Sequence, residues 1–263
     1  MNKVLNILTL SYLKLFLLIY KMNLTICILA GGEGKRMKST LPKVLHLFKN
    51  KPMIVNIIEK SLELNPIKII IVTGKHNDLI KDTIKQFIDN KFFSKLVFVI
   101  QETPLGTGHA ILCTLEKYID NEMVLILNGD TPNITTNLLK KFINKNENRL
   151  LISEIDFPSG YGRVVMNAQN EILKIVEEKD ASETEKKINK INSGIYYLKS
   201  IDLINYVPKI ANNNKQNEYY LTDIVEIMVK NNNKINGFLI NKEDNNLILG
   251  VNTIEQLNNL EKL

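Results

Sequence analysis

From residue 23 onward, short apolar runs alternate with segments whose apolar residues recur at helical spacing. Apolar runs of the kind found in strands buried on both faces lie at 24–29, 68–73, 96–100 and 123–127. Segments with one apolar face, which predict helices, lie at 53–64, 77–88 and 107–119. Asn77 can cap the second helix, and Ile111, Leu115, Tyr118 and Ile119 form the apolar stripe of the third. This alternation is typical of βαβ units, so we expect a Rossmann-like α/β fold whose mixed, mainly parallel sheet is flanked by helices.

The pattern changes near residue 149, where strands follow one another with few helices between them. Further strands are predicted at 150–155, 162–167, 172–176, 191–198 and 235–240. Further helices are predicted at 201–206, 219–230 and 253–263. We therefore expect one domain over 22–263, made of two halves at about 22–148 and 149–252 and a C-terminal helix at 253–263.

Residues 1–21 form an apolar N-terminal extension that the α/β pattern does not include. A membrane-spanning helix needs about 20 apolar residues, and a lysine such as Lys14 near its midpoint costs roughly 2.5–3.5 kcal/mol. No small-residue cleavage site of a secretory signal follows. Three interpretations stay open: a signal anchor, a leader without functional consequence, or translation from an upstream start. We do not expect the protein to act at a membrane.

Charge and cysteine usage exclude several classes of protein. The net charge of +6 comes from lysines scattered along the chain, and no compact basic patch with interleaved aromatic residues predicts nucleic-acid binding. Cys27 and Cys113 are both expected in the core, and two cysteines make neither a disulfide framework nor a metal site. We therefore expect a cytoplasmic protein in a reducing compartment.

The first strand runs directly into a glycine-rich segment, Leu29-Ala30-Gly31-Gly32-Glu33-Gly34-Lys35-Arg36-Met37. Glycines allow backbone N–H groups to approach phosphate oxygens closely, and Arg36 and Lys43 add cations nearby. The spacing is G-G-x-G, which differs from the G-x-G-x-x-G of dinucleotide-binding proteins, and no G-x-x-x-x-G-K-[ST] string occurs. The segment predicts a phosphate-binding turn that belongs to neither of those classes.

A second candidate site follows the fourth strand, where Leu127-Asn128-Gly129 leads to Asp130. Ligands of open α/β folds bind at the carboxyl ends of the strands, and Asp130 is expected at that edge. Magnesium in nucleotide sites commonly takes only one or two protein oxygens beside phosphates and water. Asp130 is therefore a candidate Mg²⁺ ligand, and the alternative is an ordinary turn aspartate.

Several further motifs occur in a fixed order along residues 23–255. They are Leu41-Pro42-Lys43-Val44-Leu45-His46, Leu105-Gly106-Thr107-Gly108-His109-Ala110, Gly160-Tyr161-Gly162-Arg163, Val176-Glu177-Glu178-Lys179-Asp180, Ile191-Asn192-Ser193-Gly194, Glu218-Tyr219-Tyr220-Leu221-Thr222-Asp223 and Gly250-Val251-Asn252. With the glycine-rich segment and Asp130, they make the chain resemble the uridyltransferase domain of the bacterial bifunctional N-acetylglucosamine-1-phosphate uridyltransferase / glucosamine-1-phosphate acetyltransferase. The resemblance implies the nucleotidyltransferase variant of the Rossmann-like fold.

The resemblance also implies roles for individual residues. The expected triphosphate contacts are Leu29, Gly31, Gly32 and Gly34 of the glycine-rich segment together with Arg36 and Lys43, and the expected uracil contacts are Gln101, Gly106 and Thr107. The expected Mg²⁺ ligands are Asp130 and Asn252, and the expected N-acetylglucosamine contacts are Gly162, Glu177 and Asn192, with Asn128 beside them. Arg36, Lys43 and Asp130 are expected to be catalytic. The family pattern differs at Gly31 (alanine), Lys35 (threonine), Asn128 (tyrosine) and Glu178 (histidine).

The implied activity is transfer of UMP from UTP to N-acetylglucosamine 1-phosphate with release of pyrophosphate. The chain carries no hexapeptide repeats of the acetyltransferase β-helix, so we expect the substrate to arrive already acetylated. Because that β-helix makes the bifunctional enzymes trimers, the oligomeric state stays open. Two alternatives also stay open: a nucleotidyltransferase for another base or sugar, and a non-catalytic nucleotide-sugar-binding subunit.

Overall fold

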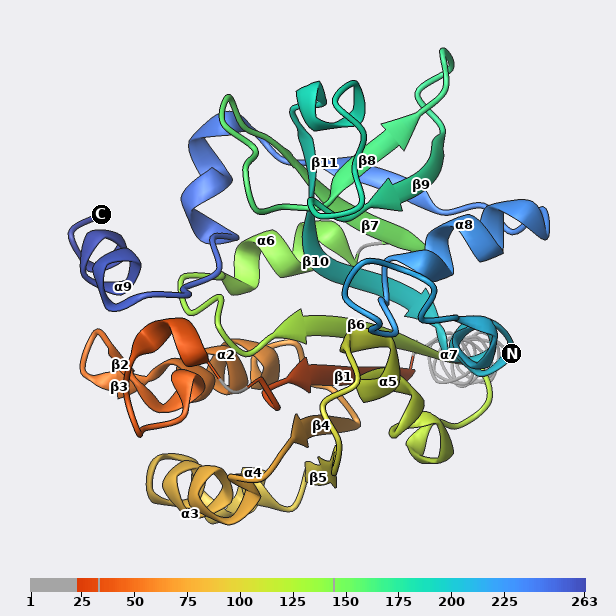
Figure 1. Cartoon of the computed structure of the whole chain (residues 1–263). Helices are drawn as coiled ribbons and strands as arrows, with labels where there is room; N and C mark the ends of the chain where they lie inside the picture. The colour runs from red at the N-terminus through yellow and green to blue at the C-terminus, as the bar shows by residue number, and fades with distance from the viewer. Residues whose placement is uncertain (1–22, 33, 144) are drawn as a thin grey trace, which may run out of the picture.

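A computed structural model describes residues 23–32, 34–143 and 145–263 (Figure 1). Its larger sheet contains β1 (Asn23–Leu29), β4 (Lys68–Thr73), β5 (Leu96–Ile100), β6 (Glu122–Asn128), β7 (Arg149–Glu154), β8 (Arg163–Met166), β9 (Ile172–Val176), β10 (Lys190–Lys199) and β11 (Asn236–Leu239). A separate hairpin pairs β2 (Leu47–Phe48) with β3 (Lys51–Pro52). The helices are α2 (Met53–Leu62), α3 (Asn77–Phe87), α4 (Asn90–Phe93), α5 (Thr107–Leu112), α6 (Thr136–Phe142), α7 (Ser200–Tyr206), α8 (Asp223–Lys230) and α9 (Ile254–Glu261).

The main path of the sheet runs β11-β7-β10-β6-β1-β4-β5. β6, β1, β4 and β5 are parallel, with Leu29 opposite Asn128 where β1 and β6 end. β10 is antiparallel to both β6 and β7, whereas β11 is parallel to β7. In Figure 1, β6 lies between β10 and β1, and the β8–β9 hairpin projects from the β10 side. The sheet is therefore mixed and mainly parallel, as expected.

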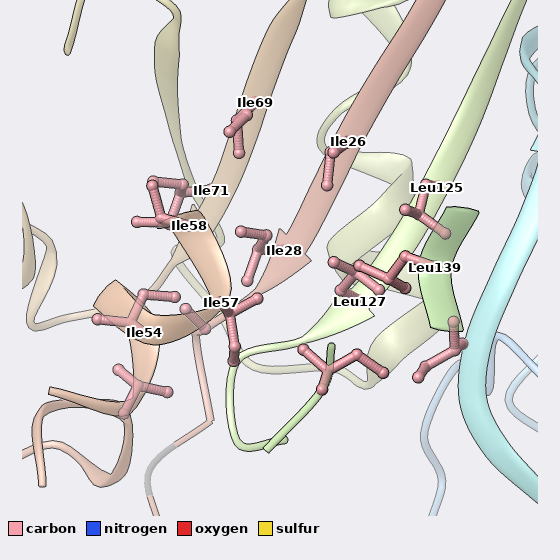
Figure 2. Packing of buried hydrophobic residues seen from close by; sticks show 14 of the residues in the cluster. Ile26, Ile28, Ile54, Ile57, Ile58, Ile69, Ile71, Leu125, Leu127 and Leu139 are labelled. Carbon is pink, nitrogen blue, oxygen red and sulfur yellow. The ribbon is translucent and has the colours of Figure 1, made fainter. Parts of the chain in front are cut away.

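Helices cover both faces of the sheet. On one face, isoleucine and leucine side chains of β1, β4 and β6 pack against α2, α3 and α6, and Figure 2 shows Ile57 and Ile58 of α2 beside Ile28 and Ile71. On the other face, alternate residues of the same strands pack against α5, α7 and α8. Because successive side chains of a strand point to opposite faces, strands covered on both sides are apolar at most positions.

The last helix, α9, packs against residues near the beginning of the chain's first half. Leu257 and Leu260 of α9 are buried with Val251 against Met37, Phe48 and Met53. Figure 1 shows α9 near the β2–β3 hairpin. This contact brings residues 250–252 back to the glycine-rich segment, which no local sequence pattern predicts.

All nine predicted strands agree with the structure to within one residue at each end, but three helix predictions are wrong. The helix expected at 107–119 ends at Leu112, where the Thr114 hydroxyl donates to the Ile111 carbonyl, and a separate 3-10 turn follows. The helix expected at 219–230 begins only at Asp223, because Tyr219 pairs through its backbone with Leu105 and Gly108. Asn77 is the first helical residue and not the cap.

The structure also corrects the prediction for Cys113, and one prediction concerns residues that the structure does not describe. Cys27 is fully buried as expected, whereas Cys113 is only partly buried because it lies at the C-terminus of the shortened α5. Helix α6 had not been predicted. The extension 1–21 lies outside the described residues. Among residues 23–263 with the two gaps, none of the helices is long and apolar enough to cross a bilayer.

Candidate functional site

Three adjoining cavities open at the carboxyl ends of β1, β4, β5 and β6. Their volumes are about 310, 260 and 800 Å³. Leu29, Thr107, Asn128 and Asp130 line both of the first two cavities, and Lys43 lines the first and the third. All fifteen predicted site residues line at least one of the three. The structure thus brings them together, while the role of each stays a prediction.

The glycine-rich segment forms one wall, and two of its glycines leave little room for a side chain. A Cβ on Gly34, whose φ is +62°, would lie 2.6 Å from the Cβ of Lys43. A Cβ on Gly31 would lie 3.3 Å from the backbone of Thr73. The short 3-10 turn Lys35–Met37 then places Arg36 at the third cavity, anchored by the buried side chain of Met37.

A compact group of cations and oxygens lies where the cavities meet. The Lys43 ammonium donates to Asp130 Oδ2 and, at 3.2 Å, to Asn252 Oδ1, while Arg36 Nη2 donates to the same Asn252 oxygen at 2.9 Å. The Lys43 and Asp130 side chains are only 14% and 20% exposed. Low exposure strengthens these charge-assisted contacts relative to surface pairs.

The residues of this group come from segments far apart in sequence. Asp130 follows β6, and Gly129 N–H donates to the Leu29 carbonyl at 2.8 Å, which ties the two strand ends together. Val251 N–H donates to the Asp130 carbonyl at 2.8 Å and so places Asn252 beside it. Gly250 lies beside the same carboxylate, since a Cβ on it would be 3.4 Å from Asp130 Oδ1, an ordinary contact distance.

The donor set suits a hard divalent cation. A carboxylate and an amide oxygen already converge on one cationic group, and oxygen ligands are those that Mg²⁺ and Ca²⁺ prefer. Among the described residues no cluster of three or more His, Cys, Asp or Glu side chains could hold a metal by itself. A metal there would need ligands from a bound phosphate or water, as in many nucleotide sites.

The first cavity is closed by Gln101 and the segment around Gly106. The Gln101 side-chain amide contacts the Gly106 carbonyl and His109 Nδ1, each at 3.0 Å. Gly106 has φ 112° and ψ 173°, and a Cβ there would lie 2.5 Å from the Tyr219 carbonyl oxygen. Only glycine allows this close approach, which holds the Gln101 side chain at the cavity wall.

The second cavity is lined by polar groups from the β8–β10 region. Glu177 accepts a hydrogen bond from Thr222 Oγ1 at 3.1 Å, and Asn192 N–H donates to the Gly162 carbonyl at 2.9 Å. Burial raises the pKa of Glu177, and the negative charges of Asp223, Asp180 and Glu218 add to that shift. A buried carboxylate of this kind is a strong acceptor for ligand hydroxyl or amide groups.

Asn128 lies on the boundary between the first two cavities. Its side-chain nitrogen is 3.3 Å from the Ser193 carbonyl, and a Cβ on Gly194, whose φ is +76°, would be 2.3 Å from that nitrogen. The Asn128 side chain therefore packs directly against the irregular part of β10 that follows Asn192.

Sequence reasoning missed several cavity residues. Tyr161, Thr222 and Gly250 line the second cavity, and Glu218 lines the first and third. Burial raises the pKa of Tyr161, with a contribution from the nearby charge of Asp130. Each of these residues occurs inside a motif that had been recognised, but neighbouring residues in one motif do not reveal which side chain faces a cavity.

Comparison with known proteins identifies the family. Residues 26–244 match the family model described as nucleotidyl transferase. A probable UDP-N-acetylglucosamine pyrophosphorylase of Acanthamoeba polyphaga mimivirus is 42% identical over 247 residues, which cover 91% of this chain and 96% of that protein. The bifunctional protein GlmU of Thermoanaerobacter pseudethanolicus is 40% identical over 241 residues, or 90% of this chain. The chain spans about half (50%) of that bacterial relative's length.

Solved structures agree with the fold. A UDP-glucose pyrophosphorylase complexed with UDP-glucose superposes with a TM-score of 0.72 at 20% identity, covering 92% of this chain and 98% of the other. At that identity the match speaks for the Rossmann-like fold alone. Together with the sequence matches, which confirm the resemblance found from the motifs, these observations show that the chain belongs to the nucleotidyl transferase family.

Proposed function

We propose that the protein transfers UMP from UTP to N-acetylglucosamine 1-phosphate, forming UDP-N-acetylglucosamine and pyrophosphate with Mg²⁺. The observation that carries the proposal is the continuity of the cavities across the Lys43–Asp130–Asn252 group. One cavity extends toward Gln101 and the other toward Glu177, so two ligands can meet where the cations lie. The name of the viral relative, a probable UDP-N-acetylglucosamine pyrophosphorylase, supports this choice of substrates.

The reaction requires two anions to approach each other. An oxygen of the sugar phosphate attacks the α-phosphorus of UTP, and the bond from that phosphorus to the pyrophosphate oxygen breaks. The attacking phosphate is already ionised at neutral pH, so no side chain has to remove a proton. The chain's main contribution is electrostatic stabilisation by groups fixed in place before the reaction.

Arg36 and Lys43 supply that positive charge from the chain itself. Arg36 is part of the glycine-rich segment and Lys43 lies beside it, where backbone N–H groups and glycines leave room for phosphate oxygens. Asp130 and Asn252 would hold Mg²⁺, which when bound offsets charge on the phosphates. His109, by contrast, contacts Gln101 and is assigned to support of the base-side wall.

The two ends of the cavity provide recognition. Gln101, Gly106 and Thr107 are assigned to the uracil, whose ring carries both hydrogen-bond donors and acceptors. Gly162, Glu177 and Asn192 are assigned to the N-acetylglucosamine moiety, with Asn128 beside it. Carboxylate and amide groups bind sugar hydroxyls and the acetamido N–H readily.

The setting proposed for this activity is the cytoplasm, with small-molecule substrates and no nucleic-acid partner. Both cysteines are free, and burial raises the pKa of the Cys27 thiol to about 12, which keeps it protonated and unreactive. Residues 22–148 are proposed as the nucleotide-binding half and 149–252 as the sugar-binding half of one domain.

A pyrophosphate-release assay tests the proposal. Purified protein is given UTP, CTP or dTTP in combination with the 1-phosphates of glucose, glucosamine and N-acetylglucosamine, with Mg²⁺ present. The expected result is the highest kcat/KM for UTP with N-acetylglucosamine 1-phosphate. Preference for another base or another sugar would replace the proposed substrates, and no release with any pair would favour a binding protein without turnover.

A further inference from the structure

Beside the second cavity, the one assigned to the sugar, lies an ion pair between a buried arginine and a partly exposed glutamate, to which the proposed reaction assigns no role. Arg163, at the start of β8, is only 2% exposed, and its Nη2 lies 2.6 Å from Glu178 Oε2. The Glu178 side chain is 31% exposed at the rim of the third cavity. A guanidinium buried to this degree requires a negative partner, because an unpaired buried charge is strongly destabilising.

Both members of the pair also hold the backbone of residues 160–162. Arg163 Nη1 donates to the Tyr161 carbonyl, and Gly160 N–H donates to Glu178 Oε2 at 3.3 Å. Arg163 Nη2 reaches the Lys186 carbonyl at 3.5 Å on the other side. The ion pair therefore fixes the loop at two points, one before and one after the Gly160–Tyr161 peptide.

This loop forms one wall of the second cavity. Gly160, Tyr161 and Gly162 all line it, and the position of a Cβ on Gly162 would be 3.5 Å from both Glu177 carboxylate oxygens. The Gly162 carbonyl accepts from Asn192 N–H at 2.9 Å. A shift of the loop would therefore be felt at Glu177 and Asn192, the two side chains assigned to the sugar.

We propose that Glu178 is a positioning residue for the sugar phosphate: through Arg163 and the Gly160 N–H, its carboxylate holds the 160–162 loop against the sugar-side cavity. In this arrangement Glu178 acts through the loop, whereas its neighbour Glu177 is the residue assigned to contact with the sugar. Only the expected change in KM for the sugar phosphate rests on the proposed function; the anchoring of the loop by Glu178 does not.

Two substitutions of Glu178 and one control test the inference. Glu178→Gln keeps the shape and removes the charge, whereas Glu178→Ala removes both anchoring contacts. The control is Glu116→Gln, which breaks the exposed pair of Glu116 with Lys117 (2.7 Å) outside the three cavities. Hydrogen exchange of residues 158–163 and steady-state kinetics are measured for each variant.

The kinetic expectation is selective. KM for N-acetylglucosamine 1-phosphate rises about fivefold in Glu178→Gln and about 30-fold in Glu178→Ala, while KM for UTP and kcat stay within about twofold of wild type. Exchange of the Gly160 amide becomes about three- to tenfold faster in both variants, and Glu116→Gln changes neither quantity. A general loss of structure would instead impair kcat and both KM values together, and that result would overturn the assignment.

Hydrogen exchange is measured without substrate, so the proposed function and the positioning role of Glu178 can fail separately. If wild-type protein does not turn over any sugar phosphate, the proposed function fails, and faster exchange at residue 160 still supports the anchoring role of Glu178. If wild type is active but neither the sugar KM nor the exchange changes, Glu178 has no positioning role. If Glu178→Ala does not fold, Glu178→Gln decides the question alone.

Discussion

Three glycines near the cavities differ in what a methyl group would encounter, and this difference predicts a graded series of stabilities. Gly106 has φ 112° and ψ 173°, a region that is essentially restricted to glycine, and a Cβ there would lie 2.5 Å from a backbone oxygen. Gly160 has φ +86° with nothing within 4 Å of an added Cβ. An added Cβ on Gly32 also meets nothing within 4 Å, and its φ lies outside the left-handed region.

The expected loss in the free energy of unfolding is the sum of two costs, backbone strain at the substituted residue and steric overlap of its Cβ. Backbone strain at Gly106→Ala costs about 1–3 kcal/mol and overlap about 1–3 kcal/mol more, so the free energy of unfolding should fall by about 2–6 kcal/mol. Tyr219 cannot move away cheaply, because its own backbone bonds to Leu105 and Gly108 hold it at 2.8 and 2.7 Å. Gly160→Ala has strain of about 1–2 kcal/mol, partly offset by about 0.4–1 kcal/mol from the stiffer unfolded chain. Gly32→Ala should be neutral or slightly stabilising.

Equilibrium urea unfolding of the three variants and wild type measures these differences. From the most to the least stable variant, the expected order is Gly32→Ala, Gly160→Ala and Gly106→Ala. KM for UTP should also rise in Gly106→Ala, because the Gly106 carbonyl holds the Gln101 side chain. If Gly106→Ala were within about 0.5 kcal/mol of Gly32→Ala, the close approach of Tyr219 would have been assigned wrongly.

Three further predictions concern the charged groups. Lys43→Met should lower kcat/KM for UTP by about 100-fold or more, because it removes a cation fixed at the phosphates; steady-state kinetics would contradict the assignment if the loss stayed below about tenfold. Asp130→Asn should abolish turnover while far-UV circular dichroism and the melting temperature show a folded protein, and Mg²⁺-dependent activity in this variant would refute the assignment of Asp130. Burial and the charges of Glu226 and Asp180 raise the pKa of Asp223 from 3.8 to about 6, so this group's contribution to stability is complete below about pH 4 and is lost as the pH rises through 6. Urea unfolding of Asp223→Asn should therefore show its stability rising relative to wild type between pH 4 and pH 6, and a constant difference would show that the pKa is not raised.

The parallel half of the sheet could be predicted from the sequence because its signal is local. Strands of such a sheet are apolar at most positions, and the bounds of β4 and β5 were predicted to the residue from their apolar runs. The ends of helices were harder to predict from the sequence, because they depend on individual hydrogen bonds. Thr114 interrupts an otherwise helical apolar pattern through a bond to the backbone, and Tyr219 is held out of α8 by contacts with residues more than 100 positions earlier.

The candidate site shows the same division. The glycine-rich segment and Asp130 carry chemical meaning in their own sequence, since glycines permit phosphate approach and a carboxylate ends a buried strand. Asn252 does not, because its place beside Asp130 depends on the Val251–Asp130 backbone bond and on α9 packing against Met37 and Phe48. Only the resemblance to a known family predicted it. The Arg163–Glu178 pair could not be predicted, since neither residue's burial is visible in the sequence.

The proposed function requires that one site joins UMP to N-acetylglucosamine 1-phosphate. Phosphorus-31 NMR follows the reaction directly when wild-type protein is mixed with UTP, N-acetylglucosamine 1-phosphate and Mg²⁺. We expect the sugar phosphate resonance to disappear while resonances of a sugar-linked diphosphate and of pyrophosphate grow in equal amounts, and we expect no change with Asp130→Asn. Release of inorganic phosphate in place of pyrophosphate would contradict the proposal. A sugar phosphate resonance that stays unchanged while wild-type protein consumes UTP would also contradict it.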